Sequence, residues 1–222
     1  MTVILACRSR DKAVQAASRI NADQPPPPPP LLHAASTGQN RRRCRGQAIV
    51  LAQPLDLSSF ASVRAFAAAV KERYTHIDIL INNAGRNTSG KSDDTSKHND
   101  GQPLDLLFQS NFLGHYLLTA ELMDVLVAQP PHHPTGARII QLASVMHHFA
   151  AASISCSSSG TTTTMDVTRV SDWTACALAH EQPTDTYSLS KLAAILFTLA
   201  LQQRYGTKQH GITAIAVNPG AV

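Results

Sequence analysis

The fold is most clearly indicated by one stretch of the chain, Ile77-Asp78-Ile79-Leu80-Ile81-Asn82-Asn83-Ala84-Gly85. Four of its first five residues are apolar and three of these are isoleucine, which predicts a short strand. The asparagines and the glycine that follow predict a turn at the carboxyl end of that strand. The same order, a short apolar strand followed by polar residues, recurs along the chain.

Predicted strands and helices alternate on both sides of this stretch. Apolar runs predict further strands at 2–7, 48–51, 138–142 and 213–217. Further patterns predict helices at 11–21, 59–73 and 103–128, and one that carries Tyr187 and Lys191 and continues to about Tyr205. This alternation is typical of βαβ units, so the expected fold class is α/β, with a doubly wound, Rossmann-like parallel sheet and helices on both faces. Open sheets of this kind bind ligands at the carboxyl ends of their strands.

Two segments interrupt the pattern. Residues 22–46 contain six consecutive prolines, Pro25 to Pro30, followed by polar and basic residues, and 150–180 is rich in serine, threonine and alanine without a clear period. A proline run can join neither a helix nor a central strand. We interpret both segments as insertions, the first of them disordered, within a single domain over 1–222.

Composition limits the class of protein. The chain has 222 residues, 43% of them hydrophobic and 15% charged, with a net charge of +4, as expected of a soluble globular domain. No aromatic residues interleave with the basic run 41–45, so we expect a solvated loop there and no nucleic-acid partner. The cysteines and paired histidines lack metal-ligand spacing, so we expect no metal. No apolar run approaches the roughly 20 residues of a transmembrane helix, and we expect a cytoplasmic protein.

The strongest sign of chemistry is the stretch Tyr187-Ser188-Leu189-Ser190-Lys191. Residues four apart on a helix point from one face. A lysine ammonium beside a phenol stabilises the phenolate, which makes the tyrosine a proton donor and acceptor near neutral pH. The pair alone is also common on solvated helices, so its meaning depends on the other motifs.

Five motifs in order give the chain a family resemblance. They are Asn82-Asn83-Ala84-Gly85, Asn111, Ser144, Tyr187 with Lys191, and Asn218-Pro219-Gly220. This order resembles the short-chain dehydrogenase/reductase family. The segments 6–9, 111–115 and 144–148 are similar to its retinol-dehydrogenase-like branch, which includes the WW-domain oxidoreductases.

The resemblance implies a catalytic role for four residues. Tyr187 would be the general acid in carbonyl reduction and the general base in alcohol oxidation, and Lys191 would support it and bind the nicotinamide ribose. Ser144 would hold the substrate oxygen, and Asn111 would anchor a relay water through its backbone carbonyl. The implied reaction is hydride transfer that interconverts a small lipophilic alcohol and its aldehyde or ketone.

The resemblance also implies a cofactor site. Asn83, Ala84 and Gly85 would lie beside the adenine ribose, and Asp56 would face the adenine. Pro219 and Gly220 would contact the cofactor together with Tyr187 and Lys191. Arg8 follows the first predicted strand, where a guanidinium suits a 2′-phosphate, so NADP(H) is expected in preference to NAD(H).

The chain also departs from the family pattern. The family's glycine-rich turn, its first strand, its last strand and its substrate-binding region are not found in the sequence. That first strand normally lies between the strands expected at 2–7 and 77–81, so we expect an interrupted sheet, in which each unpaired buried backbone group costs about 1–3 kcal/mol. The alternative function is an inactive, incomplete reductase that acts as a binding or regulatory module. The family often pairs through the helix expected at 103–128 and the helix that carries Tyr187 and Lys191, which allows a homodimer.

Overall fold

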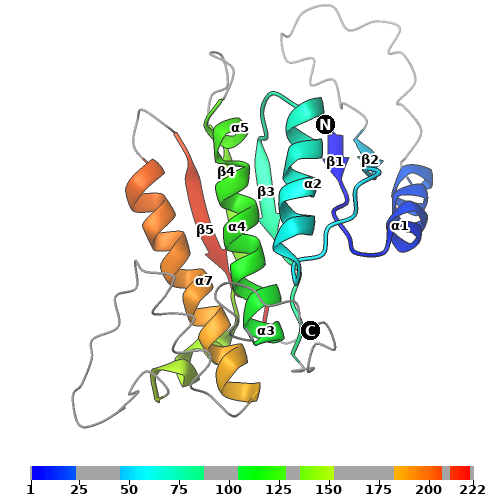
Figure 1. Cartoon of the computed structure of the whole chain (residues 1–222). Helices are drawn as coiled ribbons and strands as arrows, with labels where there is room; N and C mark the ends of the chain where they lie inside the picture. The colour runs from blue at the N-terminus through cyan, green and yellow to red at the C-terminus, as the bar shows by residue number, and fades with distance from the viewer. Residues whose placement is uncertain are drawn as a thin grey trace, which may run out of the picture. The chain divides into compact units, whose positions relative to one another are not determined.

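The computed structural model describes residues 2–23, 46–87, 105–128, 136–152, 183–206 and 211–220. The chain divides into two compact units, Met1–Asp56 and Leu57–Val222, whose elements are labelled in Figure 1. Most of each predicted insertion, 24–45 and 153–182, lies outside the described residues. None of the helices described is both long and apolar enough to cross a membrane.

The first unit is a small strand–helix–strand arrangement. It contains β1 (Thr2–Ile4), α1 (Arg10–Ala22) and β2 (Gln47–Ile49), and β1 pairs with β2 in parallel. The Ser9 side chain accepts a hydrogen bond from the Lys12 N–H and caps α1. At the other end of α1, the Asn21 amide makes two hydrogen bonds of 2.9 Å with the backbone of Ala48 in β2. The helix is therefore fixed to the strand that follows it.

The second unit is a three-stranded parallel sheet with helices across one face. The sheet order is β3 (Ile79–Asn82), β4 (Arg138–Leu142) and β5 (Thr213–Val217). Figure 1 shows α2 (Phe60–Arg73), α4 (Gly114–Glu121) and α7 (Pro183–Tyr205) side by side over it. All pairings are parallel, as predicted, and the strands form two sheets, which agrees with the predicted interruption.

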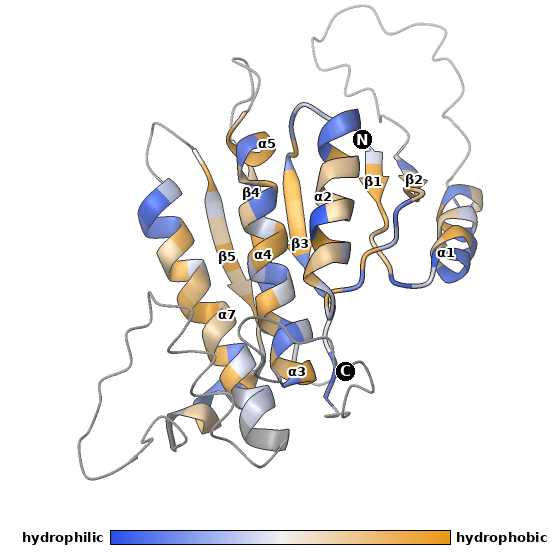
Figure 2. Ribbon diagram, viewed as in Figure 1, coloured by the Kyte–Doolittle hydropathy of each residue, from blue (hydrophilic) through white to orange (hydrophobic). Residues whose placement is uncertain are grey.

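The two faces of this sheet differ in burial. On the helix-covered face Asn82, Ile139 and Gln141 are buried. On the opposite face Ile81 is 58% exposed and Ile215 is 40% exposed, and Figure 2 shows that β3 is strongly hydrophobic. The helices predicted on both faces therefore lie on one face of this sheet among the described residues.

The helix predicted over 103–128 is interrupted. It consists of α3 (Leu106–Phe108), a π-helical segment (Gln109–Leu113), α4 and α5 (Met123–Val127). The Asp105 side chain caps its start by accepting a 2.8 Å hydrogen bond from Phe108 N–H. Within the π segment the Gly114 N–H donates to the Gln109 carbonyl, one residue further back than in an α-helix. Apolar periodicity does not reveal this change, because both helix types bury the same stripe.

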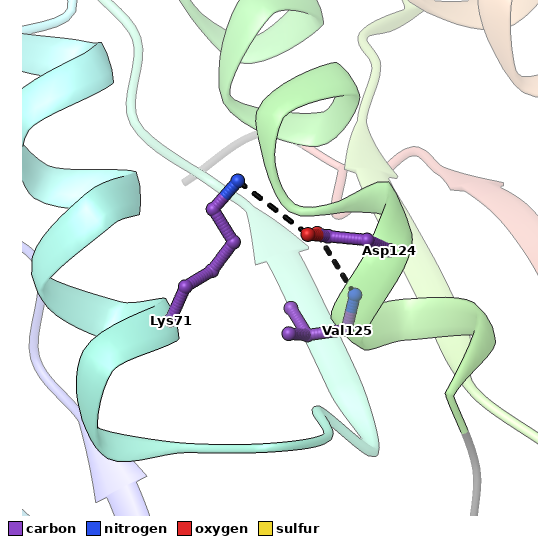
Figure 3. A network of polar contacts seen from close by, with 3 residues as sticks. All are labelled: Lys71, Asp124 and Val125. Atoms are coloured by element: carbon purple, nitrogen blue, oxygen red, sulfur yellow. Dashed lines mark hydrogen bonds and ion pairs between the residues drawn. The ribbon is translucent and has the colours of Figure 1, made fainter.

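Polar contacts join α2 to the end of the interrupted helix. Asp124 accepts a 2.9 Å hydrogen bond from the Val125 N–H and lies 3.5 Å from Lys71 Nζ, so one carboxylate in the first turn of α5 also reaches α2 (Figure 3). The Asp124 side chain is 64% exposed, and an exposed ion pair contributes at most about 1 kcal/mol. Apolar packing, including Val63 and Phe66 of α2, therefore supplies most of the stabilisation here.

Gly114 permits the close approach of α4 to the start of the second unit. A Cβ atom at this position would contact the Leu57 carbonyl oxygen and lie 2.8 Å from the Leu57 Cβ. Those distances are shorter than carbon contacts allow, and the backbone of Leu57 cannot move without displacing its own segment. The glycine is therefore required by packing.

We expect Gly114→Ala to destabilise the protein by roughly 1–3 kcal/mol, because the added methyl group overpacks against backbone atoms. The measurement is the free energy of unfolding in urea. Helix propensity alone predicts the opposite sign, a gain of about 1 kcal/mol. Ala120→Gly at an exposed position of α4 gives the local propensity difference as a control, and a stabilised Gly114→Ala variant would contradict the packing argument.

Candidate active site

Tyr187 and Lys191 lie one turn apart on α7 at the carboxyl end of β4. The Lys191 Nζ lies 5.5 Å from the centroid of the Tyr187 ring and donates a 2.9 Å hydrogen bond to the carbonyl of Leu142, the last residue of β4. Lys191 is 6% exposed, and this burial lowers the pKa of its ammonium. The predicted pair is therefore held next to the sheet.

The packing of α7 explains why the pair is oriented in this way. Leu189 and Ala193 are buried in an apolar cluster with Phe108, Phe112 and Leu113. Residues 189 and 193 are four apart, so they form one face of the helix, and Tyr187 and Lys191, each two residues from Leu189, lie on nearly the opposite face. The Ser190 hydroxyl also donates a 2.7 Å hydrogen bond to the Tyr187 carbonyl. The local sequence thus fixes the rotation of the helix.

Ser144 lies just beyond β4 and starts a short helix. Its hydroxyl accepts a 3.3 Å hydrogen bond from Met146 N–H, and its carbonyl accepts one of 2.6 Å from His147 Nδ1. The 3-10 helix η2 (Val145–Ala152) follows directly and packs against α7. Sequence reasoning did not predict η2. The serine and the Tyr187–Lys191 pair therefore belong to two elements that are packed together.

Asn111 lies in the π segment and is 4% exposed. Its side chain makes two 2.8 Å hydrogen bonds with the backbone of Arg86, accepting from the N–H and donating to the carbonyl. Its own carbonyl accepts a hydrogen bond from His115 Nδ1. A carbonyl oxygen can accept two hydrogen bonds, so the relay water expected at this atom stays a prediction.

Gly85 lies where these groups meet. A Cβ atom at this position would lie 3.6 Å from both Asn111 Oδ1 and Lys191 Nζ. Asn83, Ala84 and Gly85 are exposed and follow β3 without regular structure. The backbone at the carboxyl end of β3 is thus open on one side and faces the amide and the ammonium on the other.

The remaining predicted cofactor residues occupy two places. Pro219 and Gly220 are exposed and follow β5, whose Val217 is paired with Leu142 of β4. Arg8 and Asp56 belong to the first unit, where Arg8 is exposed after β1 and Asp56 is half-buried at its end. The structure thus brings together Gly85, Asn111, Tyr187 and Lys191, with the residues after β4 and β5 on neighbouring strands.

His115 is a site residue to which sequence reasoning assigned no role. It is 5% exposed, and its Nδ1 lies 3.1 Å from the Asn111 carbonyl oxygen. Burial lowers the pKa of His115 from 6.5 to about 4, with the Lys191 charge acting in the same direction. The imidazole is therefore neutral near pH 7. The four-residue spacing from Asn111 was the available signal, because it stacks the two residues on one helix face.

Among the residues that the structure describes, no three histidine, cysteine, aspartate or glutamate side chains are grouped so that they could hold a metal ion. The groups that the sequence analysis predicted for this site are a phenol, an ammonium, a hydroxyl and an amide, at or near the carboxyl ends of parallel strands. Such a set can move a proton and hold an oxygen atom.

Comparison with known proteins yields one family. The family model described as short chain dehydrogenase matches residues 32–170. Human retinol dehydrogenase 13 is 32% identical over 223 residues, covering 98% of this chain and 50% of that protein. The WW domain-containing oxidoreductase of Drosophila melanogaster is 30% identical over 225 residues, covering 98% of this chain and 42% of that protein. The chain spans about half the length of these relatives.

Solved structures show the same fold. The RhlG/NADP active-site complex of Pseudomonas aeruginosa superposes with a TM-score of 0.59 at 20% sequence identity, over 99% of this chain and 62% of that one. This similarity supports the predicted α/β fold class. The match to retinol dehydrogenases confirms the branch that the sequence motifs indicated.

We expect the stability of the protein to depend on pH through His115. Because the folded chain lowers the pKa of His115 to about 4, the unfolded chain binds a proton between about pH 6.5 and pH 4 that the folded chain does not. The stability that the neutral, buried imidazole contributes is thus fully present above about pH 6.5 and is lost as the pH falls toward 4. His115→Asn removes this titration, so between pH 7 and pH 4 the wild type should lose roughly 3 kcal/mol more than the variant.

Urea unfolding at both pH values, followed by circular dichroism, measures this difference. Carboxylates titrate in both proteins, so their effect on the free energy of unfolding cancels when the two are compared. An equal loss of stability in the wild type and in His115→Asn would contradict a buried, neutral imidazole.

Proposed function

This chain belongs to the short-chain dehydrogenase family, and we propose that it is a nicotinamide-dependent oxidoreductase that interconverts a lipophilic alcohol and its aldehyde or ketone. The observation that carries the proposal is the position of the Lys191 ammonium, which contacts the Tyr187 ring, the Leu142 carbonyl and the Gly85 region. A buried ammonium beside a phenol at the end of a strand suits proton transfer.

Tyr187 is proposed to move the proton. In carbonyl reduction its hydroxyl would donate a proton to the substrate oxygen, and in alcohol oxidation it would accept one. Lys191 places a positive charge beside the Tyr187 ring, and an ammonium has two further N–H donors beyond the one directed at Leu142. The pair thus combines a proton carrier with a fixed positive charge.

Ser144 is proposed to hold the substrate oxygen, and the side chains after it support a lipophilic substrate. Val145 is 54% exposed and Phe149 is 63% exposed, both on the 3-10 helix that starts at the serine. Exposed apolar side chains beside a reactive hydroxyl suit an apolar partner. A relative of this chain is named a retinol dehydrogenase, and retinol is a lipophilic alcohol.

A nicotinamide cofactor fits the residues present. The exposed backbone of 83–85 lies beside Lys191 and Asn111, and the absence of a Cβ at Gly85 keeps that edge open. When bound, the cofactor would supply or accept the hydride. Lys191 would bind its ribose, and Asn83, Ala84, Gly85, Pro219 and Gly220 would form the surrounding surface.

We further propose that NADP(H) is preferred over NAD(H). Arg8 is exposed in the segment between β1 and α1 and carries the only charge between β1 and the Ser9 cap of α1. A guanidinium binds a phosphate through paired hydrogen bonds and charge. The solved relative from Pseudomonas aeruginosa is described as an NADP complex, which is consistent with this preference.

We expect Tyr187→Phe to lower kcat by about 10²- to 10⁴-fold, because the variant has no hydroxyl to exchange a proton. Turnover of retinal and of a panel of lipophilic ketones with NADPH is the measurement. Tyr116→Phe is the matched control, since Tyr116 packs on the aromatic cluster around Phe112 and should retain its activity within about twofold. More than a tenth of wild-type turnover in Tyr187→Phe would refute the role, and NADPH binding without any wild-type turnover would favour an inactive binding module.

We expect Arg8→Asp to weaken NADPH binding by roughly tenfold or more and to weaken NADH binding much less, because the acid repels the 2′-phosphate. Calorimetric titration with each cofactor measures the ratio of the two dissociation constants. Arg10→Asp changes the net charge by the same amount two residues away and should leave this ratio within about twofold. An unchanged ratio in Arg8→Asp would remove the basis for the preference.

A further inference from the structure

The buried histidine of α4 makes a hydrogen bond that fixes its tautomer. His115 Nδ1 lies 3.1 Å from the carbonyl oxygen of Asn111, one turn earlier in the same helical run. A carbonyl oxygen can only accept, so Nδ1 carries the hydrogen and Nε2 carries the lone pair. The ring is neutral near pH 7 because burial lowers its pKa to about 4. His115 is thus a fixed neutral donor.

The His115 donor lies next to the π-helical segment of the same helical run. Between Gln109 and Leu113 the backbone hydrogen bonds span five residues, as shown by Gly114 N–H donating to the Gln109 carbonyl. Such a segment shifts the register of the backbone hydrogen bonds where it returns to an α-helix, and a side-chain donor can act there beside the backbone. The His115 imidazole reaches the Asn111 carbonyl at this return point.

The backbone of His115 is itself anchored to the sheet. The Thr119 hydroxyl donates a 2.8 Å hydrogen bond to the His115 carbonyl, and the Asn82 amide donates a 3.0 Å bond to the Thr119 hydroxyl. Asn82, Thr119 and His115 are each at most 5% exposed. A buried set of hydrogen bonds therefore runs from β3 through α4 to the Asn111 carbonyl.

Beyond Asn111 the contacts continue into the proposed site. The Asn111 amide holds both backbone groups of Arg86 at 2.8 Å. Gly85 precedes Arg86, and a Cβ on it would lie 3.6 Å from Lys191 Nζ. Any rotation of Asn111 would therefore move the segment that lies against the ammonium.

We infer that His115 is a positioning residue: its Nδ1–H holds the Asn111 carbonyl, and this fixes the Asn111 amide that orders the Gly85–Arg86 segment beside Lys191. The catalytic consequence rests on the proposed oxidoreductase function, whereas the structural consequence does not. His115 touches no reacting atom in this role, so its loss should act through the Gly85–Arg86 segment, on the rate of the chemical step and on cofactor binding.

Three substitutions separate this role from general packing. Asparagine places an N–H group the same number of bonds from Cα as His115 Nδ1, glutamine places it one bond further, where Nε2 would be, and leucine removes the donor. In the full chain, we expect His115→Gln and His115→Leu to lower kcat roughly 10- to 100-fold and to weaken NADPH binding as well, because the Gly85–Arg86 segment belongs to the proposed cofactor surface. His115→Asn should retain kcat within about threefold.

Amide hydrogen exchange tests the structural part without any activity. The Arg86 N–H donates to Asn111 Oδ1, so we expect it to exchange about tenfold faster in His115→Gln and His115→Leu and at the wild-type rate in His115→Asn. The Leu126 N–H, which donates to the Leu122 carbonyl in the same helical run, is the internal reference and should change little.

The outcomes are distinguishable. If the wild type shows no turnover, the proposed function fails, and the exchange rate of Arg86 still decides the role of His115. If His115→Leu does not fold, the comparison of His115→Asn with His115→Gln remains. Equal Arg86 exchange in those two variants would overturn the inference.

Discussion

A buried ammonium must have a hydrogen-bond acceptor, and the bond from Lys191 Nζ to the Leu142 carbonyl meets this requirement. Leaving such a charge buried and unpaired costs several kcal/mol, so α7 has little freedom to slide along β4. Tyr187 lies one turn before the lysine, and Ser144 lies two residues beyond Leu142. A single hydrogen bond therefore sets the positions of the phenol and the hydroxyl relative to the sheet, and the chemistry proposed for this chain depends on it.

Three buried polar residues, one from β3 and two from α4, impose a second constraint. Asn82, Thr119 and His115 are buried on the helix-covered side of the sheet, where apolar residues would pack with a smaller desolvation cost. Their hydrogen bonds instead fix the direction of α4 and of the π segment that precedes it. A fully apolar contact would permit small rotations, whereas directional bonds do not. These hydrogen-bonded polar residues stabilise the fold less than apolar residues would, but they orient Asn111.

Local signals in the sequence predicted most of the elements. The strands at 138–142 and 213–217 have the predicted bounds, because short apolar runs flanked by polar residues have one interpretation. Ser59 caps α2, since a serine ahead of an apolar periodic run accepts a hydrogen bond from an N–H group in the first turn. The π segment, the short 3-10 helix after Ser144 and the division of the 103–128 helix were not predicted. Each is set by contacts with residues distant in the sequence, such as those between α7 and η2.

The sequence by itself determined the fold class, the family and the identity of the groups that carry the proposed chemistry, because the order of motifs at strand ends is a property of the chain alone. Tertiary structure decided which of those groups meet. Gly85, Asn111 and Lys191 come from three different elements, and their distances follow from how α4 and α7 pack on the sheet. It also decided the role of His115, because a histidine four residues after an asparagine becomes a neutral, fixed donor only when its surroundings exclude water.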